Sequence, residues 1–325
     1  MISFIVIGLN EGWRLDKCLK SICHLVEFNN FTNYEIIYVD SNSRDNSIEI
    51  ARQYKVHKIY KISGDVNAAI ARNVGAKYAV GECLFFLDGD IELQPFYFSA
   101  IINTNNELII PFVVGHLDDV NYTDEWKFIN QIPRSYKSNR MDKYVSKVGG
   151  AIFIIKKQIW DQCKGMDDKF KKNQDRDFSL RLRRQGIPAL RKKEILGLHH
   201  TIPYKDKKRM WKMMFSGAYC YKALTIRRHL FNPYYFSVLI FEESSLIVLV
   251  LTIIFCFIFN IKIFICYLIF VLIRNIKHIS NLKRFLIFYL HRIMQDIIVL
   301  FSILFFYPKK PKYTVNEYVF NNQRF

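Results

Sequence analysis

The chain has 325 residues, and its 47 lysine and arginine residues outnumber its 29 aspartate and glutamate residues, which gives a formal net charge of +18. This length suits one large or two modest domains. The charge points to an anionic partner such as a phosphorylated ligand, a membrane surface or nucleic acid. Seven cysteines without a CxxC pair exclude a disulfide framework and a zinc site of that kind, and favour a reducing, cytosolic environment.

Residues 1 to about 100 alternate short apolar runs with helical patterns. The runs predict strands at 3–8, 35–39, 58–62 and 83–87, and the patterns between them predict helices at 15–23, 47–54 and 68–80. The N-terminal run lacks a basic region and a cleavage site, so we interpret it as a buried strand and not as a signal peptide. The alternation predicts βαβ units and a parallel sheet.

Polar clusters follow three of these strands. Asn10 and Glu11 follow the first, Asp40 the second, and Asp88 and Asp90 the fourth. Because ligands of open α/β sheets bind beyond the carboxyl ends of the strands, we expect the clusters to converge at one edge. Two carboxylates separated by one glycine suit a divalent cation bridged to a nucleotide diphosphate. Neither a GxGxxG fingerprint nor a GxxxxGK[ST] loop is present, so the nucleotide must be held in another way.

Together these motifs resemble the inverting glycosyltransferases of family 2, over roughly residues 1–225. The resemblance implies an α/β GT-A fold, a Rossmann-like nucleotide-binding mixed sheet flanked by helices. It is carried by residues 6–11, 37–45, 71–75, 81–82, 88–90 and 173–182. Several such motifs in the right order are a stronger signal than any one of them.

The resemblance implies a nucleotide-diphosphate sugar as donor. Asp40 would hydrogen-bond the nucleotide base, with Asn10 and Glu11 in the same pocket; the alternative for Asp40 is a cap of an Asx turn. Arg72 would contact the base or the diphosphate, since a guanidinium is permanently charged and grips phosphate oxygens; the alternative is a surface arginine. Gly150 would lie in the loop under the donor sugar.

The resemblance also implies a metal and a base. Asp90 would bind Mn²⁺ or Mg²⁺ directly, and Asp88 would contact the ribose or the metal. His199 or His200 would complete the metal shell, with a polar strand end as the alternative. Asp175 would be the catalytic base that takes the proton of the acceptor hydroxyl.

One position departs from the family pattern. Gln174 replaces the usual glutamate beside the base, which puts any auxiliary role of that position in doubt. Asp177 and Arg181 follow at i,i+4 spacing, and we interpret them as a structural pair.

From residue 236 the composition becomes strongly apolar, and we divide the chain into a catalytic domain at 1–228 and a membrane-associated helical region at 229–325. At about 1.5 Å per residue, 236–259 could cross a hydrocarbon core of about 30 Å, whereas 261–273 reaches only about 20 Å. We therefore expect a tilted hairpin or a re-entrant pair, with two clean spans as the alternative. The segment 285–307 carries His291, Arg292, Gln295 and Asp296 in its middle, which favours an amphipathic helix in the membrane plane.

Basic residues indicate the orientation. They cluster before, between and after the apolar segments, at 191–228, 274–284 and 309–312. The positive-inside rule then predicts a catalytic domain on the cytoplasmic face of the cell membrane, attached to anionic lipids. No nucleic-acid-binding motif occurs, so that class of partner is disfavoured.

The sequence thus predicts a metal-dependent glycosyltransferase that extends a lipid-linked saccharide in bacterial surface-glycan biosynthesis. One alternative is a polyprenyl-phosphate glycosyltransferase that loads one sugar onto a lipid phosphate. A processive synthase is disfavoured because no Gln-x-x-Arg-Trp motif occurs. Another alternative is a non-catalytic membrane scaffold, since fold does not guarantee chemistry; the presence of Asp88, Asp90 and Asp175 together argues against it.

Overall fold

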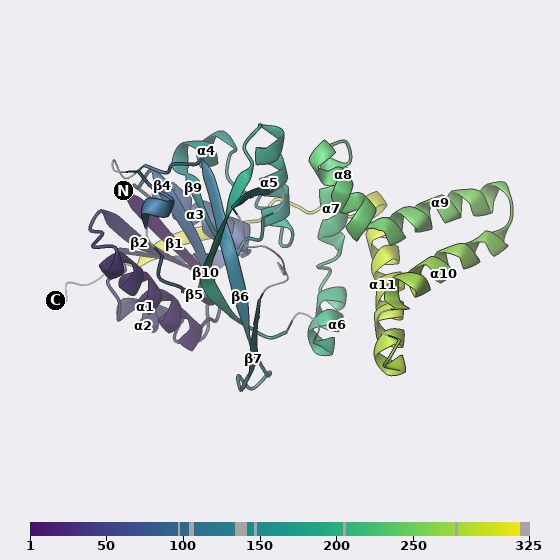
Figure 1. Cartoon of the computed structure of the whole chain (residues 1–325), viewed down its shortest axis with the longest axis horizontal. Coiled ribbons are helices and arrows are strands. Elements are labelled where there is room, and N and C mark those ends of the chain that lie inside the picture. Colours follow the sequence, from purple (N-terminus) through teal and green to yellow (C-terminus); the bar gives the residue numbers. More distant parts are fainter. Residues whose placement is uncertain are drawn as a thin grey trace. The chain divides into compact units, whose positions relative to one another are not determined.

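The computed structural model in Figure 1 describes residues 1–96, 98–103, 107–133, 142–145, 148–203, 206–276 and 279–318. The chain forms two compact units. Unit 1 comprises Met1–Asp206 together with Lys309–Phe325, and unit 2 comprises Lys207–Pro308. These units divide the chain at other positions than the expected boundary between a catalytic domain and a membrane-associated region at residue 228, which stays a prediction.

Unit 1 is an α/β unit built on one mixed sheet, as the sequence predicts. Its strands are β1 (Ile2–Gly8), β2 (Tyr34–Asp40), β3 (Lys58–Gly64), β4 (Cys83–Asp88), β5 (Ile91–Leu93), β6 (Phe112–Tyr122), β7 (Phe128–Pro133), β8 (Lys143–Val145), β9 (Ile152–Lys156), β10 (Ala189–Thr201) and β11 (Tyr313–Tyr318). Its helices are α1 (Trp13–Phe28), α2 (Ser47–Arg52), α3 (Ala68–Tyr78), the 3-10 helix η1 (Phe98–Ala100), α4 (Lys157–Gln162) and α5 (Gln174–Arg184).

The strand order of the sheet is β11-β3-β2-β1-β4-β9-β6-β10-β5, with β7 beside β6 and β8 beside β10. The first four strands pair in parallel, which confirms the expected βαβ series. β9 is antiparallel to both β4 and β6, and β10 is parallel to β6. Consequently β1, β2, β4, β6 and β10 all end at the same edge of the sheet, where ligands of α/β proteins bind.

Helices cover both faces of the sheet (Figure 1). Side chains of a strand alternate between the faces, so Phe4 of β1 packs in the cluster that contains Leu15 and Ile22 of α1, whereas Ile5 packs with Val74 of α3. In α1 the buried residues recur every three or four positions, which is the apolar stripe of a surface helix. The two resulting cores hold the strand ends rigidly.

Close packing of α3 on the sheet depends on Gly75. A Cβ atom at this position would lie 2.2 Å from Cγ2 of Ile5, so no larger residue fits without moving the helix. At the start of the helix, the Asn67 side chain accepts a hydrogen bond from the backbone N–H of Ile70 at 3.0 Å. These two features fix the position of Arg72, which lies between them on the same helix.

The strand β11 is an element that the sequence analysis missed. It pairs antiparallel with β3, so that Val315 lies opposite Ile62 at the edge of the sheet. The backbone N–H of Lys312 donates to Oδ2 of Asp65 at 3.0 Å, which anchors the entry to the strand. The yellow strand in Figure 1 therefore belongs to unit 1, although it follows unit 2 in the sequence.

Unit 2 is helical. Its elements are α6 (Lys207–Phe215), α7 (Cys220–His229), α8 (Pro233–Glu242), α9 (Ser244–Ile258), the 3-10 helix η2 (Ile261–Ile263), α10 (Phe264–Asn275) and α11 (Leu282–Phe305). Within the described residues, only α11 is by itself long and apolar enough to cross a membrane. The pair α8 and α9, bent by 81°, would provide a second crossing if the two formed one span.

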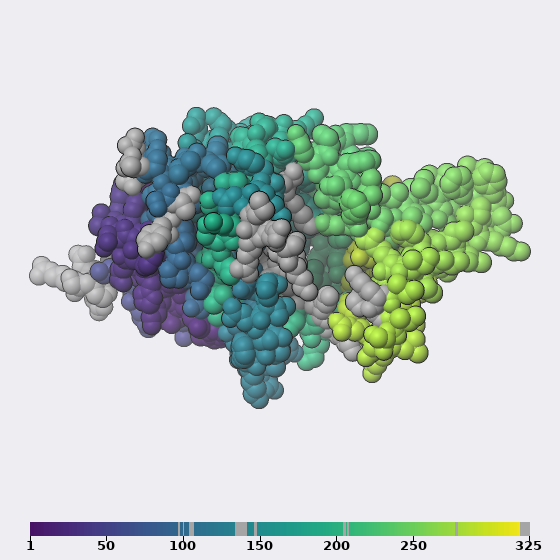
Figure 2. Space-filling view, viewed as in Figure 1, coloured from purple at the N-terminus to yellow at the C-terminus, as the bar shows by residue number. Residues whose placement is uncertain are grey.

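The helices α9 and α10 form a hairpin that projects from the rest of unit 2, seen in green in Figure 2. We call residues 244–273 the arm. At its base, the Arg274 guanidinium donates to the carbonyl oxygens of Phe241 at 2.8 Å and Glu242 at 3.1 Å.

The polar residues in the middle of α11 do not form an exposed face. His291, Gln295 and Asp296 are buried within unit 2, and the Tyr267 hydroxyl donates to Oδ2 of Asp296 at 3.0 Å. Hydrogen-bonded polar residues inside a helical unit require no aqueous surface, so these three side chains no longer argue for a helix in the membrane plane. The position of α11 relative to a membrane stays a prediction.

Candidate functional site

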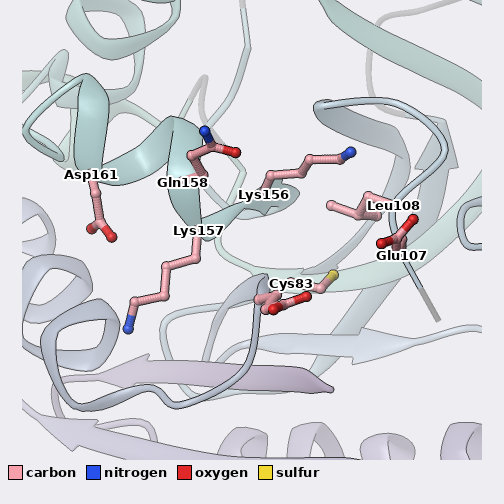
Figure 3. A pocket seen from close by; sticks show the side chains of 8 residues that line it. Cys83, Glu107, Leu108, Lys156, Lys157, Gln158 and Asp161 are labelled. Carbon is pink, nitrogen blue, oxygen red and sulfur yellow. The ribbon is translucent and has the colours of Figure 1, made fainter. Parts of the chain in front are cut away.

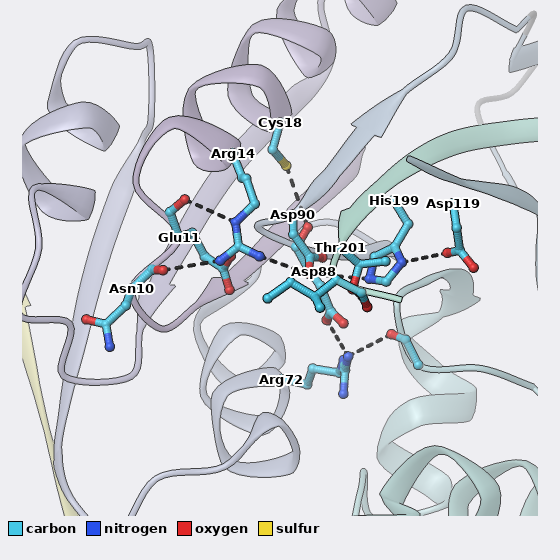
Figure 4. A network of polar contacts seen from close by, with 12 residues as sticks. Asn10, Glu11, Arg14, Cys18, Arg72, Asp88, Asp90, Asp119, His199 and Thr201 are labelled. Atoms are coloured by element: carbon cyan, nitrogen blue, oxygen red, sulfur yellow. Dashed lines mark hydrogen bonds and ion pairs between the residues drawn. The ribbon is translucent and has the colours of Figure 1, made fainter. Parts of the chain in front are cut away.

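The centre of the candidate site is the turn between β4 and β5. Asp88 ends β4, Asp90 precedes β5, and the backbone N–H of Gly89 between them donates to the carbonyl oxygen of Ile7 at 2.8 Å. A Cβ atom on Gly89 would lie 2.9 Å from Cγ of Glu11. Glycine therefore lets the turn lie close against the loop after β1, and this contact brings three carboxyl groups together (Figure 4).

Asp88 is held by a buried arginine. Nη2 of Arg72 donates to Oδ1 of Asp88 at 2.5 Å and to the carbonyl oxygen of Gly150 at 2.7 Å. Arg72 is only 1% exposed, which differs from the expectation that it contacts the base or the diphosphate. Burial raises the pKa of Asp88 to about 6 although the Arg72 charge opposes this shift. Arg72 thus orients the Asp88 carboxylate from the buried side of the site.

Glu11 and Asp90 share a second arginine, which the sequence analysis missed. Nη2 of Arg14 lies 2.7 Å from Oε2 of Glu11, and Nη1 lies 3.8 Å from Oδ2 of Asp90. Burial, together with the neighbouring Asp90 carboxylate, raises the pKa of Glu11 to about 8. The Arg14 guanidinium also lies 4.5 Å from the ring centre of Trp126. The site therefore gathers several carboxyl groups, and Arg14 is a cation that lies near both Glu11 and Asp90.

The two histidines at the end of β10 differ in their surroundings. Nε2 of His199 lies 3.4 Å from Oδ2 of Asp90, and Nδ1 lies 2.7 Å from Oδ1 of Asp119. His200 instead uses both ring nitrogens in other contacts, with Glu92 at 2.8 Å and with the Tyr122 hydroxyl at 2.8 Å. The hydrogen bond from His200 also lowers the pKa of Glu92. These contacts favour His199 over His200 as the candidate metal ligand, and metal binding by either histidine stays a prediction.

The loops after β1 and β2 are joined by hydrogen bonds. The Asn10 backbone N–H donates to Oγ of Ser43 at 2.9 Å, and Oδ1 of Asn10 accepts from the Arg44 backbone N–H at 2.8 Å. Asp40 is 0% exposed, and its Oδ2 accepts from the Ser43 backbone N–H at 2.8 Å. This is the turn cap that the sequence left open as the alternative for Asp40. Base binding by Asp40 stays a prediction. Because the Asp40 side chain is buried in this turn, the turn would have to open for a base to reach it.

Asp175 lies in the first turn of α5 and is tied to Gly150. Oδ2 of Asp175 accepts from the Gly150 backbone N–H at 2.9 Å, and Oδ1 accepts from the backbone N–H of Arg176 at 2.9 Å. Gly150 therefore links the predicted base to Arg72, because its carbonyl oxygen accepts from Arg72. Asp177 forms the expected structural pair with Arg181, at 2.9 Å between Oδ2 and Nε.

A cavity of about 300 Å³ opens over this cluster. Glu11, Asp88 and Asp90 contribute acidic groups to its lining, and Lys171 and Lys172 contribute two ammonium groups from the segment before α5. The remaining lining comes from Ile7, Gly8, Leu9, Ser41, Val66, Asn67, Ala68 and Gln174. The lysines were not among the predicted site residues, since the sequence alone does not place that segment over the turn after β4.

A larger cavity of about 400 Å³ lies at the other end of β4 (Figure 3). Cys83 at the start of the strand lines it, together with Lys156 and Lys157. Nζ of Lys157 donates to the carbonyl oxygens at the end of α3, which is a capping role. The predicted site residues do not line this cavity, so we assign the candidate site to the smaller one.

The donor set partly fits a divalent cation. Among the described residues, no group of three histidine, cysteine, aspartate or glutamate side chains is arranged to hold a metal ion. Asp90 and His199, however, have oxygen and nitrogen atoms 3.4 Å apart. Two ligands bound at about 2.1 Å to one ion can have this separation. Such a site suits a cation that takes its other ligands from substrate phosphates and water.

Comparison with known proteins identifies the family. Residues 3–160 match the model of glycosyl transferase family 2. The poly(ribitol-phosphate) beta-N-acetylglucosaminyltransferase TarP of Staphylococcus aureus is 32% identical over 35% of this chain and 36% of its own length. The 4,4'-diaponeurosporenoate glycosyltransferase of Staphylococcus haemolyticus is 36% identical over 29% of this chain and 25% of its own length.

A solved structure of S. aureus TarS with UDP-GlcNAc covers 66% of this chain and 65% of its own chain, with 16% identity and a TM-score of 0.47. The alignments with the two curated relatives span about a third and a quarter of those proteins. On the family match, residues 3–160 of the chain form a glycosyl transferase family 2 domain.

Proposed function

We propose that this protein is a metal-dependent inverting glycosyltransferase, which moves a sugar from a nucleotide-diphosphate sugar to a lipid-linked saccharide during bacterial surface-glycan biosynthesis. The observation that carries the proposal is the lining of the 300 Å³ cavity, where Asp88 and Asp90 lie with Lys171 and Lys172. Carboxylates suit a hard divalent cation, and ammonium groups suit phosphate oxygens. Both are needed to hold a diphosphate.

Each charged group has a role in this proposal. Asp90 and His199 would hold Mn²⁺ or Mg²⁺, which when bound would stabilise the negative charge on the leaving diphosphate as a Lewis acid. Lys171 and Lys172 would neutralise diphosphate oxygens. Asp88, oriented by Arg72, would accept a hydrogen bond from the ribose or complete the environment of the cation.

Asp175 would act as the general base. The acceptor hydroxyl oxygen attacks the anomeric carbon as the bond from that carbon to the diphosphate oxygen breaks, and the hydroxyl proton passes to the Asp175 carboxylate. Each carboxylate oxygen of Asp175 accepts one backbone N–H and keeps further acceptor capacity for this proton. Attack on the face opposite the diphosphate inverts the configuration of the sugar.

The arm of unit 2 supports a lipid-linked acceptor. Lys262 is its single charged residue, and Phe257 and Phe259 near its tip are 88% and 69% exposed. An apolar surface of this kind is unfavourable in water and marks a membrane or protein contact. We infer attachment to the cytoplasmic face of the cell membrane, where the basic clusters would meet anionic lipids. TarP, a relative, is named for transfer to a poly(ribitol-phosphate) polymer.

The decisive experiment supplies a panel of nucleotide sugars with Mn²⁺ to membranes that contain endogenous lipid acceptors. We expect one donor to be consumed and its sugar to appear on a lipid-linked saccharide. Asp175→Asn should lower the transfer rate by about 10²–10⁴ while nucleotide still binds. Asp90→Ala should abolish metal-stimulated nucleotide release. Asp161→Asn, an exposed carboxylate on α4, is the matched control and should transfer at the wild-type rate.

The outcomes separate the alternatives. Sugar found directly on a lipid phosphate would replace the proposed acceptor by the polyprenyl-phosphate alternative. Failure of the wild-type protein to consume any nucleotide sugar would overturn the enzyme assignment in favour of a scaffold. Transfer by Asp175→Asn at the wild-type rate would refute the assignment of the base.

A further inference from the structure

Asp119 and His199 face each other across neighbouring strands. The parallel register of β6 and β10 makes the two residues direct partners, and Oδ1 of Asp119 lies 2.7 Å from Nδ1 of His199. Both side chains are buried. The other ring nitrogen, Nε2, lies 3.4 Å from Oδ2 of Asp90. Figure 4 shows the three side chains in a row, from Asp119 at the sheet to Asp90 in the site.

We propose that Asp119 is a positioning residue that fixes the tautomer and the ring orientation of His199 for cation binding. The inference rests on the proposed function, because the cation belongs to that site. An ionised carboxylate only accepts hydrogen bonds, so the proton of a neutral His199 ring lies on Nδ1. Nε2 then carries a lone pair that faces Asp90. Histidines that bind metals commonly donate their second N–H to a carboxylate in this way.

The backbone makes this arrangement rigid. The His200 backbone N–H donates to the carbonyl oxygen of Asp90 at 3.0 Å, so the end of β10 is tied directly to the turn that carries Asp90. In addition, His199 is the register partner of Ile91 in β5. The distance between the His199 ring and the Asp90 carboxylate is therefore set by two strand pairings, and Asp119 only has to fix the rotation and protonation of the ring.

The adjacent histidine provides a comparison within the same protein. His200 also has a carboxylate partner, Glu92, but its remaining nitrogen contacts the Tyr122 hydroxyl and does not face Asp90. A histidine and a carboxylate that served only to stabilise the strand would resemble this second pair. The Asp119–His199 pair differs because its other ring nitrogen, Nε2, faces Asp90, a candidate metal ligand.

Histidine-selective ¹⁵N NMR of the full chain tests the tautomer. The wild-type protein should show His199, assigned by loss of its signals in His199→Gln, with the proton on Nδ1. Asp119→Leu should shift the ring toward the Nε2–H tautomer, because Nδ1 loses its acceptor. Tyr122→Phe, which removes the partner of His200, should leave the His199 signals unchanged. A wild-type His199 with its proton on Nε2 would overturn the proposal.

The orientation of His199 should affect the affinity for the cation. Titration with Mn²⁺ alone, followed by electron paramagnetic resonance of the free ion, measures this affinity. Asp119→Leu should bind Mn²⁺ about 10–100-fold more weakly than the wild type, whereas Tyr122→Phe should match the wild type. Asp119→Asn keeps the size of the side chain, but its amide can donate to Nδ1 and permit the opposite tautomer. Asp119→Asn should therefore lose less Mn²⁺ affinity than Asp119→Leu. It also provides a test if the leucine variant does not fold.

The two possible failures are distinguishable. If the wild-type protein does not bind Mn²⁺, the metal site of the proposed function and this inference are both refuted. If the wild type binds Mn²⁺ and the folded Asp119 variants bind it equally well, only the positioning role of Asp119 is refuted.

Discussion

The backbone N–H of Gly150 donates to Oδ2 of Asp175 at 2.9 Å, while the Gly150 carbonyl oxygen accepts from Arg72 at 2.7 Å. Arg72 in turn binds Asp88 at 2.5 Å. One residue, Gly150, thus connects the proposed base, on α5, to the carboxylate at the end of β4 through the two peptide groups that flank it. The two sides of the site are positioned by the same hydrogen-bonded chain, which makes the base sensitive to small movements of the Gly150 loop.

Substitution of Gly150 tests this connection. A Cβ atom at Gly150 would lie 3.2 Å from Cβ of Asp175 and 3.2 Å from Nη2 of Arg72, so Gly150→Ala must displace at least one of them. Because small misplacements of a catalytic group can cost up to about 10²-fold in rate, we expect kcat to fall about tenfold or more while nucleotide binding is kept. Gly149→Ala is the matched control, since a Cβ atom there meets nothing within 4 Å. Equal rates for the two variants would contradict the linkage.

The Arg72–Asp88 pair should contribute to stability as well as to the site. Arg72→Leu leaves the Asp88 carboxylate without its buried partner, and loss of one member of a buried ion pair typically costs about 3–5 kcal/mol. We expect a lower denaturant midpoint for this variant. The double variant Arg72→Leu with Asp88→Asn should recover part of the loss, because it no longer leaves a charge unpaired. A double variant that is less stable than Arg72→Leu alone would show that the carboxylate is supported by other groups.

The raised pKa values predict that the stability of the protein depends on pH and that a bound divalent cation flattens this dependence. Burial raises the pKa of Glu11 from its ordinary value of 4.5 to about 8 and that of Asp88 from 3.8 to about 6. The folded site therefore favours protonated carboxyl groups. Their contribution to the free energy of unfolding is full below about pH 4 and is lost as the pH rises through 6 and then 8.

We accordingly expect the melting temperature of the metal-free protein to fall between pH 5 and pH 8. Saturating Mn²⁺ should flatten this dependence, and Mn²⁺ affinity should rise over the same range because binding displaces protons. Calorimetry in two buffers with different ionisation enthalpies measures the proton release. The Glu11→Gln variant is the control, since it should lose the part of the pH dependence near 8. Mn²⁺ affinity that is independent of pH would contradict the prediction that a cation in this site displaces protons from Glu11 and Asp88.

The sequence predicted the parts of the site that depend on local pattern. Apolar runs followed by Asp40 or by Asp88 and Asp90 located the strand ends, and the parallel sheet confirmed that these ends share one edge. What it could not predict were the partners of charged side chains that lie far apart in the sequence, unlike the i,i+4 pair of Asp177 and Arg181. Arg72 turns inward to Asp88, and Arg14 lies between Glu11 and Asp90, because long-range packing determines which charges are buried together.

The distinction between His199 and His200 likewise required strand register. Adjacent residues of a strand face opposite ways, so a shift by one residue would exchange their roles. Asp119 had no motif of its own and became recognisable only as the register partner of His199. Similarly, β11 is short and follows unit 2 in the sequence, so no local pattern relates it to β3.

The return of the chain to β3 yields a stability prediction. Val315 packs with the core on the α3 side of the sheet, whereas Asn316 is exposed. Val315→Asp would place an unpaired charge in contact with this core, so we expect a clear fall in the melting temperature of unit 1. Asn316→Asp is the matched control and should have little effect. If both variants melt at the wild-type temperature, β11 contributes nothing to the stability of unit 1.

The arm yields a prediction about membrane attachment. A truncation at residue 236 would also remove β11, so point variants provide a cleaner test. Burial of one phenylalanine side chain contributes about 1.5–3 kcal/mol. The double variant Phe257→Ser with Phe259→Ser should therefore weaken binding to vesicles by about 100-fold or more.

Cosedimentation with vesicles of phosphatidylethanolamine and phosphatidylglycerol measures this binding. The control is Phe128→Ser, which removes a phenylalanine that is 64% exposed on β7 of unit 1 and lies outside the arm. It should bind vesicles as the wild type does. If the double arm variant also binds with wild-type affinity, the arm is not the attachment site. Loss of binding in Phe128→Ser alone would instead assign membrane contact to the β6–β7 hairpin, because an exposed aromatic residue is the only group that this variant removes.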